Sequence, residues 1–319
     1  FKNVKIINPK STIWSHFGVR FNYVVCLFIL IREILSKKKP LVFAFQANVY
    51  CIILCKILNV KIVTRSNSSP SGWTQNNLKN YIFKKAFKKA DKIIVNSLEF
   101  KKQFKKRFNV KTECIYNPLN KKEILRKSKN KINLNFFKDK KKLKILNIGR
   151  FTDQKDHLTL LKSMKILKNK YKLNFILLII GRGQNKSKIQ NFINKNNLNL
   201  NVKVIGFKKN PYKYTSCCDL FVLSSIFEGL PNVLLEAITL KKFIISSNCP
   251  TGPNEILNNG KGGLLFKTGS SNDLAKKIIF YHNNKKKLKK KIDFAYNNLD
   301  RFDFNTNLKK YFEVIADLF

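Results

Sequence analysis

The sequence predicts an α/β protein of two domains, each a parallel sheet covered by helices, with a cleft between them. Short runs rich in β-branched and aromatic residues alternate with helical segments of about 10 to 15 residues, which is the pattern of parallel sheets with both faces covered. The alternation stops once, in the Lys- and Asn-rich stretch 117–142, and then starts again. A chain of 319 residues is long enough to bury two such cores.

The first domain is expected to span residues 1–120. Each of its strands is a short apolar run bounded by polar or turn-forming residues, and each helix carries a periodic apolar stripe. Strands are predicted at 1–9, 41–45, 60–65, 92–96 and 113–116, and helices at 19–37, 47–58, 77–89 and 99–108.

Residues 121–142 are expected to form an interdomain linker, because they follow an Asn-Pro turn and lack a long apolar face. The second domain then spans 143–303, and the tail 304–319 has a roughly helical periodicity. Both halves are predicted to be Rossmann-like, and ligands of such sheets bind outside the carboxyl ends of the strands. In the second half, strands are predicted at 143–148, 173–180, 202–206, 219–225 and 243–247, a hairpin-like piece at 262–266, and helices at 157–169, 186–196, 211–216, after Pro231 and from 272 onward.

The chain is strongly basic, with 64 Lys and Arg against 18 Asp and Glu, a net charge of +46 and a pI near 10.1. Such a field attracts nucleic acid, anionic lipid or phosphorylated substrates. A basic nucleic-acid-binding protein is therefore an alternative, and it should concentrate its basic residues on one face with aromatic residues among them. The lysines are instead scattered along the sequence, which favours a compositional bias spread through the whole protein.

The seven cysteines include no C-x-x-C pair, and their odd number indicates free thiols in a reducing compartment. Cys51 and Cys55 can share a helix face, where buried thiols are expected rather than a zinc site, because the sequence has no matching Cys or His pair. No metal site is expected elsewhere, since Asp300 and Asp303 fall in a predicted helical region. The apolar run 23–31 is too short to cross a bilayer, so neither a transmembrane helix nor a signal peptide is predicted.

The stretch 224–237, SSIFEGLPNVLLEA, is the centre of the second domain. Pro231 marks a helix start, because its fixed φ suits the first turn and its missing N–H costs nothing there. The turn from Gly229 to Asn232 therefore presents free backbone N–H groups, which can bind an anion or a sugar oxygen. Glu228 before the turn and Glu236 inside the helix would suit a ligand that has hydroxyls at both ends and phosphates between them.

Within this stretch, FEGLPNVLLEA resembles the E-x7-E signature of the retaining glycosyltransferases of family 4, which have the GT-B fold, and especially the bacterial branch with an EGLPN form. The resemblance covers most of the chain in the family's order and is specific as a joint pattern. Its other segments are VTRSNSSP (63–70), FKKADKIIVNS (87–97), IYNPLN (115–120), NIGRFTDQKDHLTLL (147–161), IGRGQNKSKI (180–189), VIGF (204–207) and SSNCPTGPNEIL (246–257).

The resemblance implies a retaining transferase that moves a hexose or N-acetylhexosamine from a nucleotide-sugar, expected to be UDP-linked, to a glycan or polyprenyl-linked glycan acceptor. It places the enzyme in surface polysaccharide or glycoconjugate biosynthesis, with no cofactor and no metal. The implied location is cytoplasmic, with peripheral contact on the anionic inner face of the plasma membrane as an option, and no nucleic acid is expected as a partner.

The resemblance also assigns roles to residues of the second domain. Arg150 and Lys155 would neutralise a diphosphate leaving group, for which a bidentate guanidinium and a point charge are both suited. Glu228 would contact the donor hexose and is grouped with these two cations as catalytic. The residues expected to bind the rest of the donor are Glu236, on the ribose hydroxyls, together with Gly229, Leu230, Pro231, Asn232, Gly149, Arg182 and Gly183.

In the first, acceptor-binding domain, Arg65 and Asn67 resemble the family's RN pair after a strand, and Gln46 and Asn48 stand where many relatives carry a histidine. None of the three histidines matches that position, so all are interpreted as structural or solvent-facing: His16, His157 and His282. Histidine acid/base chemistry is therefore not expected. The implied reaction is a front-face attack in which the departing phosphate takes the acceptor's proton, while the protein supplies positioning and positive charge.

Two further expectations come from the family's organisation. Relatives begin with a strand, a glycine-rich loop and a helix, and the resemblance starts after that unit. An N-terminally truncated chain is therefore expected, with a non-catalytic nucleotide-binding relative as the alternative. The tail 304–319 is expected to be a helix that crosses back to the first domain.

Overall fold

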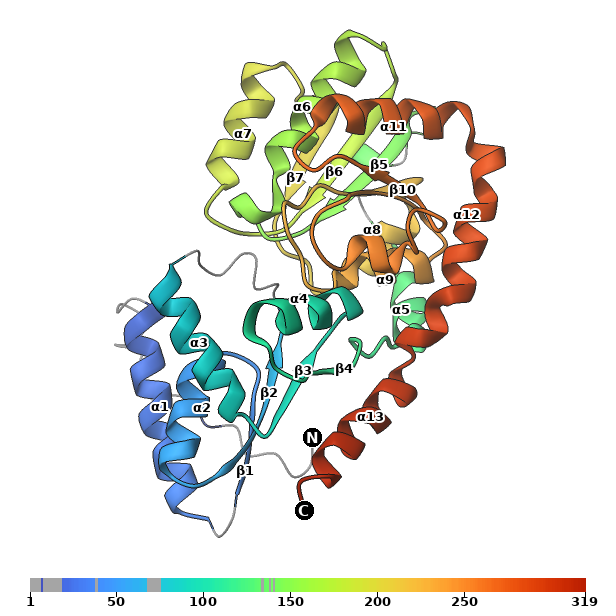
Figure 1. The fold of residues 1–319 in the computed structure, drawn as a ribbon. Coiled ribbons are helices and arrows are strands. Elements are labelled where there is room, and N and C mark those ends of the chain that lie inside the picture. The colour runs from blue at the N-terminus through green and yellow to red at the C-terminus, as the bar shows by residue number, and fades with distance from the viewer. Residues whose placement is uncertain are drawn as a thin grey trace.

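The computed structural model describes residues 7, 19–37, 40–67, 76–132, 135–137, 139 and 141–319. Within these residues the chain forms two units, each built on one parallel sheet with helices around it, so the predicted α/β class is confirmed (Figure 1). The strand predicted at 1–9 and His16 lie outside the described residues, except that Ile7 is described and is not in a strand.

The N-terminal sheet has four parallel strands in the order β1-β2-β3-β4. Parallel neighbours need a crossover, and helices supply each one. The strands are β1 (Leu41–Ala44), β2 (Lys61–Ser66), β3 (Lys92–Val95) and β4 (Glu113–Cys114), and the helices are α1 (Val19–Leu35), α2 (Asn48–Ile57), α3 (Asn77–Lys89) and α4 (Leu98–Phe108).

Four buried phenylalanines from α3 and α4 pack together in the core of this domain. Phe100, Phe104 and Phe108 are spaced four residues apart on α4 and are fully buried, so they form one face of the helix. Phe87 of α3 meets Phe104 edge-on with ring centroids 5.1 Å apart. Burying each such ring stabilises the fold by about 2 kcal/mol, which explains how a helix with five basic residues stays attached to the sheet.

The C-terminal sheet has six strands in the order β10-β9-β8-β5-β6-β7, all parallel. All six residues of β6, FILLII, are buried, because helices cover both of its faces. The strands are β5 (Leu143–Ile148), β6 (Phe175–Ile180), β7 (Val202–Ile205), β8 (Leu220–Leu223), β9 (Phe243–Ser247) and β10 (Leu264–Phe266). The helices between and after them are α6 (His157–Asn169), α7 (Lys186–Lys195), α8 (Tyr212–Ser216), α9 (Asn232–Thr239), α10 (Pro253–Ile256), α11 (Ser271–Asn283) and α12 (Lys285–Asn297).

Two stretches differ from the sequence-based expectation. The GGLLF piece is not hairpin-like: β10 pairs with β9 in parallel, and the short helix α10 makes the crossover. The stretch expected to be a linker contains α5 (Lys121–Ser128) and a 3-10 turn, Asn135–Phe137. Ile124 and Phe137 are buried in the core of the C-terminal domain, because two well-placed apolar side chains suffice to hold a short polar segment against it.

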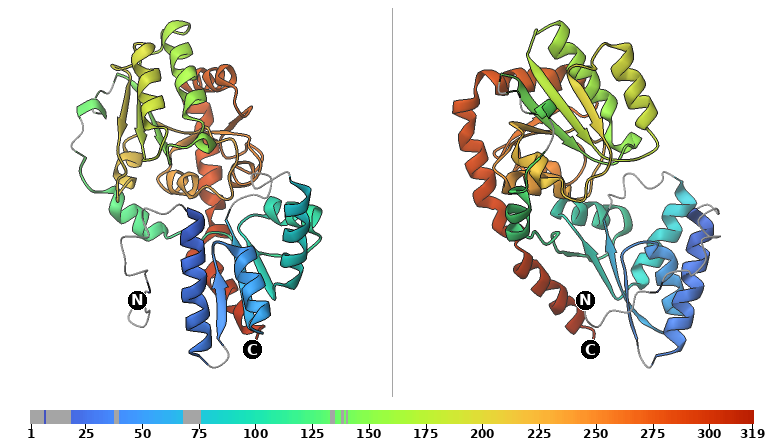
Figure 2. Two further views of the ribbon diagram at one scale, coloured as in Figure 1. Left: turned by 90° about the vertical axis from the view of Figure 1, so that its left-hand side faces the viewer. Right: turned by 180° about the vertical axis from the view of Figure 1, so that it is seen from behind.

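The last helix, α13 (Phe304–Ala316), returns to the N-terminal domain, and α12 runs along the side of the molecule to reach it (Figures 1 and 2). Val314 packs with Val63, Ile94 and Ile115 of the first domain. The two chain segments that join the domains lie side by side, since the Leu119 amide donates to the carbonyl of Phe302 at 2.9 Å.

Candidate active site between the two domains

The loop between β8 and α9 holds a buried carboxylate. Glu228 is 6% exposed, and its Oε1 accepts hydrogen bonds from Nζ of Lys155 at 2.5 Å and from Oγ of Ser225 at 2.6 Å. Its backbone is fixed as well, because the hydroxyl of Thr251 donates to the carbonyl of Glu228. A buried charge needs such a set of partners, so the position of this carboxylate is determined by the fold.

Lys155 comes from the turn after β5, and three further bonds tie that turn to the β8–α9 loop. The amide of Ile226 donates to the Gln154 carbonyl at 2.8 Å, Nε2 of Gln154 donates to the Phe227 carbonyl at 2.9 Å, and Oγ of Ser224 donates to the Lys155 carbonyl at 2.8 Å. The two loops therefore form one rigid edge at the carboxyl ends of β5 and β8.

The two cations predicted for the diphosphate differ in this arrangement. Lys155 is already paired with Glu228, whereas Arg150 is exposed and makes no ion pair with any described residue. Arg150 is thus the freer of the two cations to meet an anionic ligand, and Lys155 adds positive charge beside the buried carboxylate.

Glu236 lies one turn inside α9 and is partly buried, yet no described side chain or backbone group donates a hydrogen bond to its carboxylate. Burial raises the pKa of its carboxyl to about 7. The start of the same helix is also open, since Pro231 is the cap residue and no described side chain caps the first turn. A carboxylate and free N–H groups on one helix offer an acceptor for hydroxyls and donors for an anion.

Two glycines keep the loops after β5 and β6 in contact. A Cβ on Gly181 would overlap the backbone oxygen of Gly149, and a Cβ on Gly183, whose φ is +152°, would come within 2.5 Å of the Phe151 carbonyl oxygen. Gly149 is less constrained, because a Cβ there would make only ordinary contact with the methylenes of Lys155. The close approach requires glycine at the other two positions.

Arg182 lies over the ring of Phe207, with its guanidinium carbon 5.1 Å from the ring centroid. Both side chains are exposed at the carboxyl ends of β6 and β7. A guanidinium stacked on an aromatic ring forms a flat surface of the kind on which a nucleobase can pack.

The first domain reaches the β8–α9 loop at Gly229, where an added Cβ would overlap the backbone oxygen of Asn67. Asn117 links the two domains through its side chain: Nδ2 donates to the Leu230 carbonyl at 3.3 Å and to Oδ1 of Asn232 at 2.5 Å. Arg65 in turn donates to the side-chain oxygens of both Asn67 and Asn117. The predicted acceptor-side pair Arg65 and Asn67 therefore adjoins the loop that carries Glu228.

The other two predicted acceptor-side residues occupy different positions. Asn48 donates from Nδ2 to the Arg65 carbonyl and to Oγ of Ser66, each at 3.1 Å, so it supports the end of β2. Gln46 is exposed, and no contact among the described residues joins it to the β8–α9 loop.

The two described histidines fit the structural role expected of them. His157 is buried at the start of α6 and packs edge-on against Phe151, with ring centroids 5.3 Å apart. Burial, with the charge of Lys155 as a smaller cause, lowers its pKa to about 4, so it is neutral at pH 7. His282 lies exposed on α11, where burial of part of the ring lowers its pKa.

Sequence reasoning missed the two residues that bridge the domains, Asn117 and Glu255. Asn117 opens an Asn-Pro turn, a signal that predicts a boundary but says nothing about a contact in space. Glu255 belongs to a turn, 251–255, that is expected to be either a plain helix start or a contact with donor or acceptor, yet its carboxylate bonds to the other domain.

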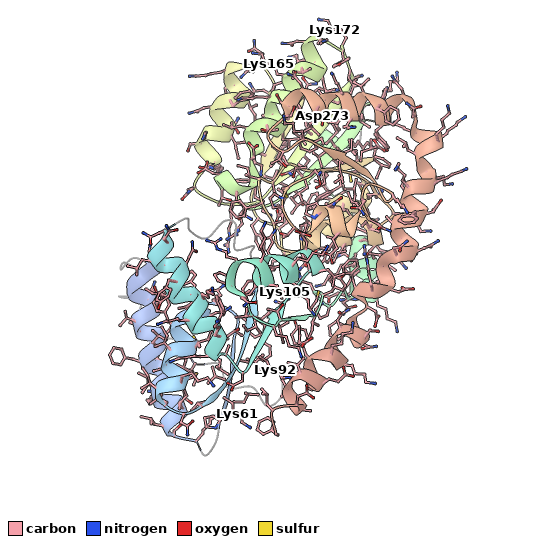
Figure 3. The ribbon with its side chains drawn as sticks, viewed as in Figure 1. Lys61, Lys92, Lys105, Lys165, Lys172 and Asp273 are labelled. Carbon is pink, nitrogen blue, oxygen red and sulfur yellow. The ribbon has the colours of Figure 1, made fainter. Side chains whose placement is uncertain are left out.

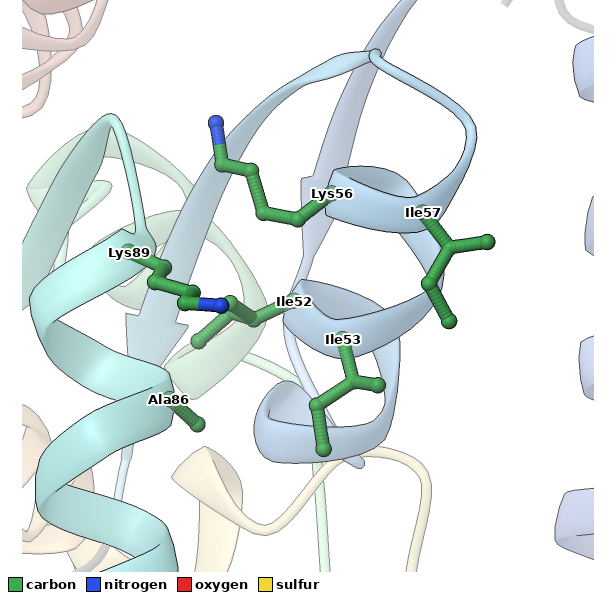
Figure 4. A pocket seen from close by; sticks show the side chains of 6 residues that line it. All are labelled: Ile52, Ile53, Lys56, Ile57, Ala86 and Lys89. Carbon is green, nitrogen blue, oxygen red and sulfur yellow. The ribbon is translucent and has the colours of Figure 1, made fainter.

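Other features of the described chain do not compete with this site. A pocket of about 180 Å³ lies between α2 and α3, and no predicted site residue lines it (Figure 4). Lysines project from both domains, as the labelled Lys61, Lys105 and Lys172 illustrate (Figure 3). No group of three or more metal-binding side chains occurs among the described residues, and none of their helices is long and apolar enough to span a bilayer.

Comparison with solved structures confirms the predicted GT-B fold. A glycosyltransferase from Rickettsia africae superposes with a TM-score of 0.73 at 19% identity, covering 98% of this chain and 83% of that one. The HepE protein of Anabaena, solved with UDP, superposes with a TM-score of 0.72 at 19% identity over 87% of this chain and 78% of its own. At this level of identity the likeness concerns the fold alone.

Among relatives, an uncharacterized glycosyltransferase from Methanocaldococcus jannaschii is 36% identical over 247 residues, which cover 71% of this chain and 60% of the relative. A Campylobacter jejuni enzyme, N-acetylgalactosamine-N,N'-diacetylbacillosaminyl-diphospho-undecaprenol 4-alpha-N-acetylgalactosaminyltransferase, is 31% identical over 191 residues, 59% of this chain and 50% of its own. The chain thus spans about 50 to 60% of the length of these relatives. Residues 128–298 match the family described as glycosyl transferases group 1, and this protein belongs to that family of glycosyltransferases.

Proposed function

We propose that the protein is a retaining glycosyltransferase of family 4 that transfers a hexose or N-acetylhexosamine from a UDP-sugar to a glycan or polyprenyl-linked glycan. The observation that carries the proposal is the carboxyl of Glu236, which has no hydrogen-bond donor among the described residues. It lies on the same helix as an open N-terminus and one loop away from the buried Glu228–Lys155 pair. The carboxylates of Glu236 and Glu228 can accept hydrogen bonds from sugar hydroxyls at the two ends of the site, and the N–H groups between them can donate to phosphate oxygens. This order matches a ribose, a diphosphate and a hexose.

In this proposal the second domain holds the whole donor. Glu236 accepts from the ribose hydroxyls, the open turn at Pro231 and Arg150 meet the diphosphate, and the surface of Arg182 and Phe207 packs on the base. Glu228, held by Lys155 and Ser225, accepts from hydroxyls of the hexose. The site needs no cofactor, because the positive groups that stabilise the departing diphosphate come from the chain itself.

The transfer step follows from that placement. The bond between C1 of the sugar and the diphosphate oxygen breaks, and the acceptor oxygen bonds to C1 on the same face. The acceptor's proton passes to the departing phosphate oxygen, so no side chain has to act as base, which agrees with the neutral, buried state of His157. The acceptor enters from the side of Arg65 and Asn67, which adjoin Gly229.

The relatives support the choice of substrates. The name of the Campylobacter jejuni relative specifies an undecaprenyl-diphosphate-linked acceptor and an N-acetylgalactosaminyl group, and a Staphylococcus aureus relative is a capsular polysaccharide biosynthesis glycosyltransferase, 36% identical over 119 residues. A lipid-linked acceptor would bring this chain to the anionic inner face of the plasma membrane. Each suitably placed lysine or arginine would add about 1 kcal/mol to peripheral binding there.

Calorimetric titration of UDP, GDP and ADP tests the donor site, with Glu236→Ala as the variant and Glu313→Ala, an exposed glutamate on α13, as the matched control. We expect UDP-selective binding that Glu236→Ala abolishes and Glu313→Ala leaves unchanged. Binding unaffected by Glu236→Ala would contradict the assignment. Product analysis by NMR then reports whether the anomeric configuration is retained, and turnover in EDTA reports whether metal is needed.

A further inference from the structure

The carboxylate of Glu255 bonds across the interface between the domains. It extends from α10 to the N-terminus of α4, where Oε1 accepts from the backbone N–H of Leu98 at 2.9 Å and Oε2 accepts from that of Glu99 at 3.2 Å. Oε1 also accepts from the hydroxyl of Tyr116 at 2.6 Å. We call these three hydrogen bonds from the first domain to Glu255 the interdomain clasp.

At the N-terminus of α4, the first domain presents backbone N–H groups that only an acceptor from outside the helix can satisfy. The first N–H groups of a helix have no partner within it and carry partial positive charge. Ser97, the cap residue of α4, satisfies the amide of Phe100 at 3.1 Å and leaves those of Leu98 and Glu99. A carboxylate with two oxygens matches two parallel N–H donors at the positive end of the helix.

Tyr116 stays a donor in this arrangement. Burial raises the pKa of its phenol well above the ordinary range, and the hydrogen bond to the Glu255 carboxylate raises it further. The ring is fixed by edge-on packing against Phe302, with ring centroids 4.8 Å apart. The phenol is therefore held by packing against a residue of the second domain, and the two backbone donors are held by the start of α4.

On the second domain, the backbone around Glu255 is equally fixed and connects to the β8–α9 loop. Arg301 donates to the carbonyls of Glu255 at 2.6 Å and Ile256 at 3.0 Å. Three residues before Glu255, Gly252 has a φ of +76° and packs so tightly that a Cβ there would overlap the Gly229 carbonyl oxygen. A shift in the position of Glu255 would therefore also shift the loop that carries Glu228.

We propose that Glu255 is a positioning residue whose carboxylate holds the two domains together and sets the acceptor side against the sugar. This inference rests on the proposed function and adds a residue for which that function assigned no role. The groups proposed to hold the nucleotide-sugar all lie in the second domain, whereas Arg65 and Asn67 lie in the first. Loss of the clasp separates the two sets, and nucleotide binding survives while transfer fails.

Glu255→Gln tests this with little change of shape, because glutamine keeps one acceptor oxygen but turns an N–H₂ group toward a backbone N–H. The control is Glu313→Gln, which removes a charge from an exposed site with no described partner. We expect Glu255→Gln to bind UDP within twofold of the unaltered chain, to lose at least tenfold in kcat/KM for the acceptor, and to show a larger radius of gyration by small-angle scattering. Unchanged kcat/KM and scattering would overturn the proposal, as would a loss of UDP affinity as large as the loss of transfer.

Tyr116→Phe is a second test in case Glu255→Gln does not fold. It removes only the hydroxyl that donates to Glu255 and leaves the aromatic ring in the core. Its kcat/KM for the acceptor should fall less than that of Glu255→Gln. The fall in the double variant should be smaller than the product of the two separate fold-changes, because both substitutions act through one carboxylate. Fully multiplicative effects would contradict a shared role.

If the unaltered chain binds no nucleotide, the proposed function fails, but the scattering comparison still decides whether Glu255 holds the domains together.

Discussion

Replacing Lys155 with methionine removes the only ion-pair partner of Glu228 among the described residues while keeping nearly the same side-chain volume. The two side chains are 15% and 8% exposed and their charged atoms are 2.5 Å apart. At this separation, and with an effective dielectric constant of about 20, the gross attraction is about 7 kcal/mol, most of which offsets the cost of removing both charges from water.

The free energy of unfolding should nevertheless fall by about 3 kcal/mol in Lys155→Met. Deleting one member of a buried pair leaves the other charge uncompensated, at a cost of roughly 3 to 5 kcal/mol. We expect the lower end of that range, because Oγ of Ser225 remains as a donor to Glu228 at 2.6 Å.

Urea unfolding followed by far-ultraviolet circular dichroism measures this effect. With a slope of about 2 kcal/mol per molar urea, a loss of about 3 kcal/mol moves the midpoint of the second domain down by about 1.5 M. The double variant Lys155→Met with Glu228→Gln should recover at least half of that loss, because glutamine carries no charge that needs compensation.

Two results would refute this reasoning. A loss below about 1 kcal/mol in Lys155→Met would mean that the pair is screened like a surface salt bridge. Additive losses in the double variant would mean that Lys155 stabilises the loop through its backbone and methylenes rather than through Glu228.

Three further outcomes are expected. Because burial raises the pKa of Glu236 from 4.5 to about 7, the folded protein holds this proton more tightly than the unfolded chain. Stability should therefore fall by up to about 3 kcal/mol as the pH rises through this window, and Glu236→Gln should flatten the dependence in melting curves recorded from pH 4.5 to 8. Gly229→Ala forces a Cβ onto the Asn67 oxygen and should lower turnover at least tenfold, while Gly206→Ala, whose Cβ would meet nothing within 4 Å, should leave it unchanged in the same assay. Arg150→Ala should change the unfolding free energy by less than about 0.5 kcal/mol, since Arg150 is exposed and without a described partner, but should lower turnover at least tenfold; equal losses in both would contradict its role.

Local pattern was enough to predict the elements that face the site. The strand predicted at 173–180 is β6, which spans Phe175–Ile180 and is buried throughout. Pro231 predicted a helix start and is the cap residue of α9, and the helix predicted at 157–169 has those bounds because Asp156 caps its first turn. Each of these signals acts within a few residues, which is the range over which a sequence determines backbone conformation.

The contacts that complete the site depend on residues far apart in sequence. Lys155 and Glu228 were each predicted for the site, but not as a pair, because 73 residues separate them and only the order of β5 and β8 in the sheet brings them together. The parallel pairing of β10 was missed for the same reason, since nothing in the segment GGLLF indicates which strand it pairs with. Glu255 looked like an ordinary residue of a helix start, because its partners belong to another domain.

Because α13 returns to the N-terminal domain, that domain is completed only after the C-terminal domain has been synthesised. The N-terminal sheet is synthesised early, but Val314, which covers Val63, Ile94 and Ile115, is synthesised near the end of the described chain. At about 5 to 20 residues per second, the roughly 200 residues in between take some 10 to 40 s to synthesise. During that time an apolar face of the N-terminal domain is exposed to chaperones and to non-native contacts. Proteolytic removal of α13 would expose the same face again and destabilise the N-terminal domain.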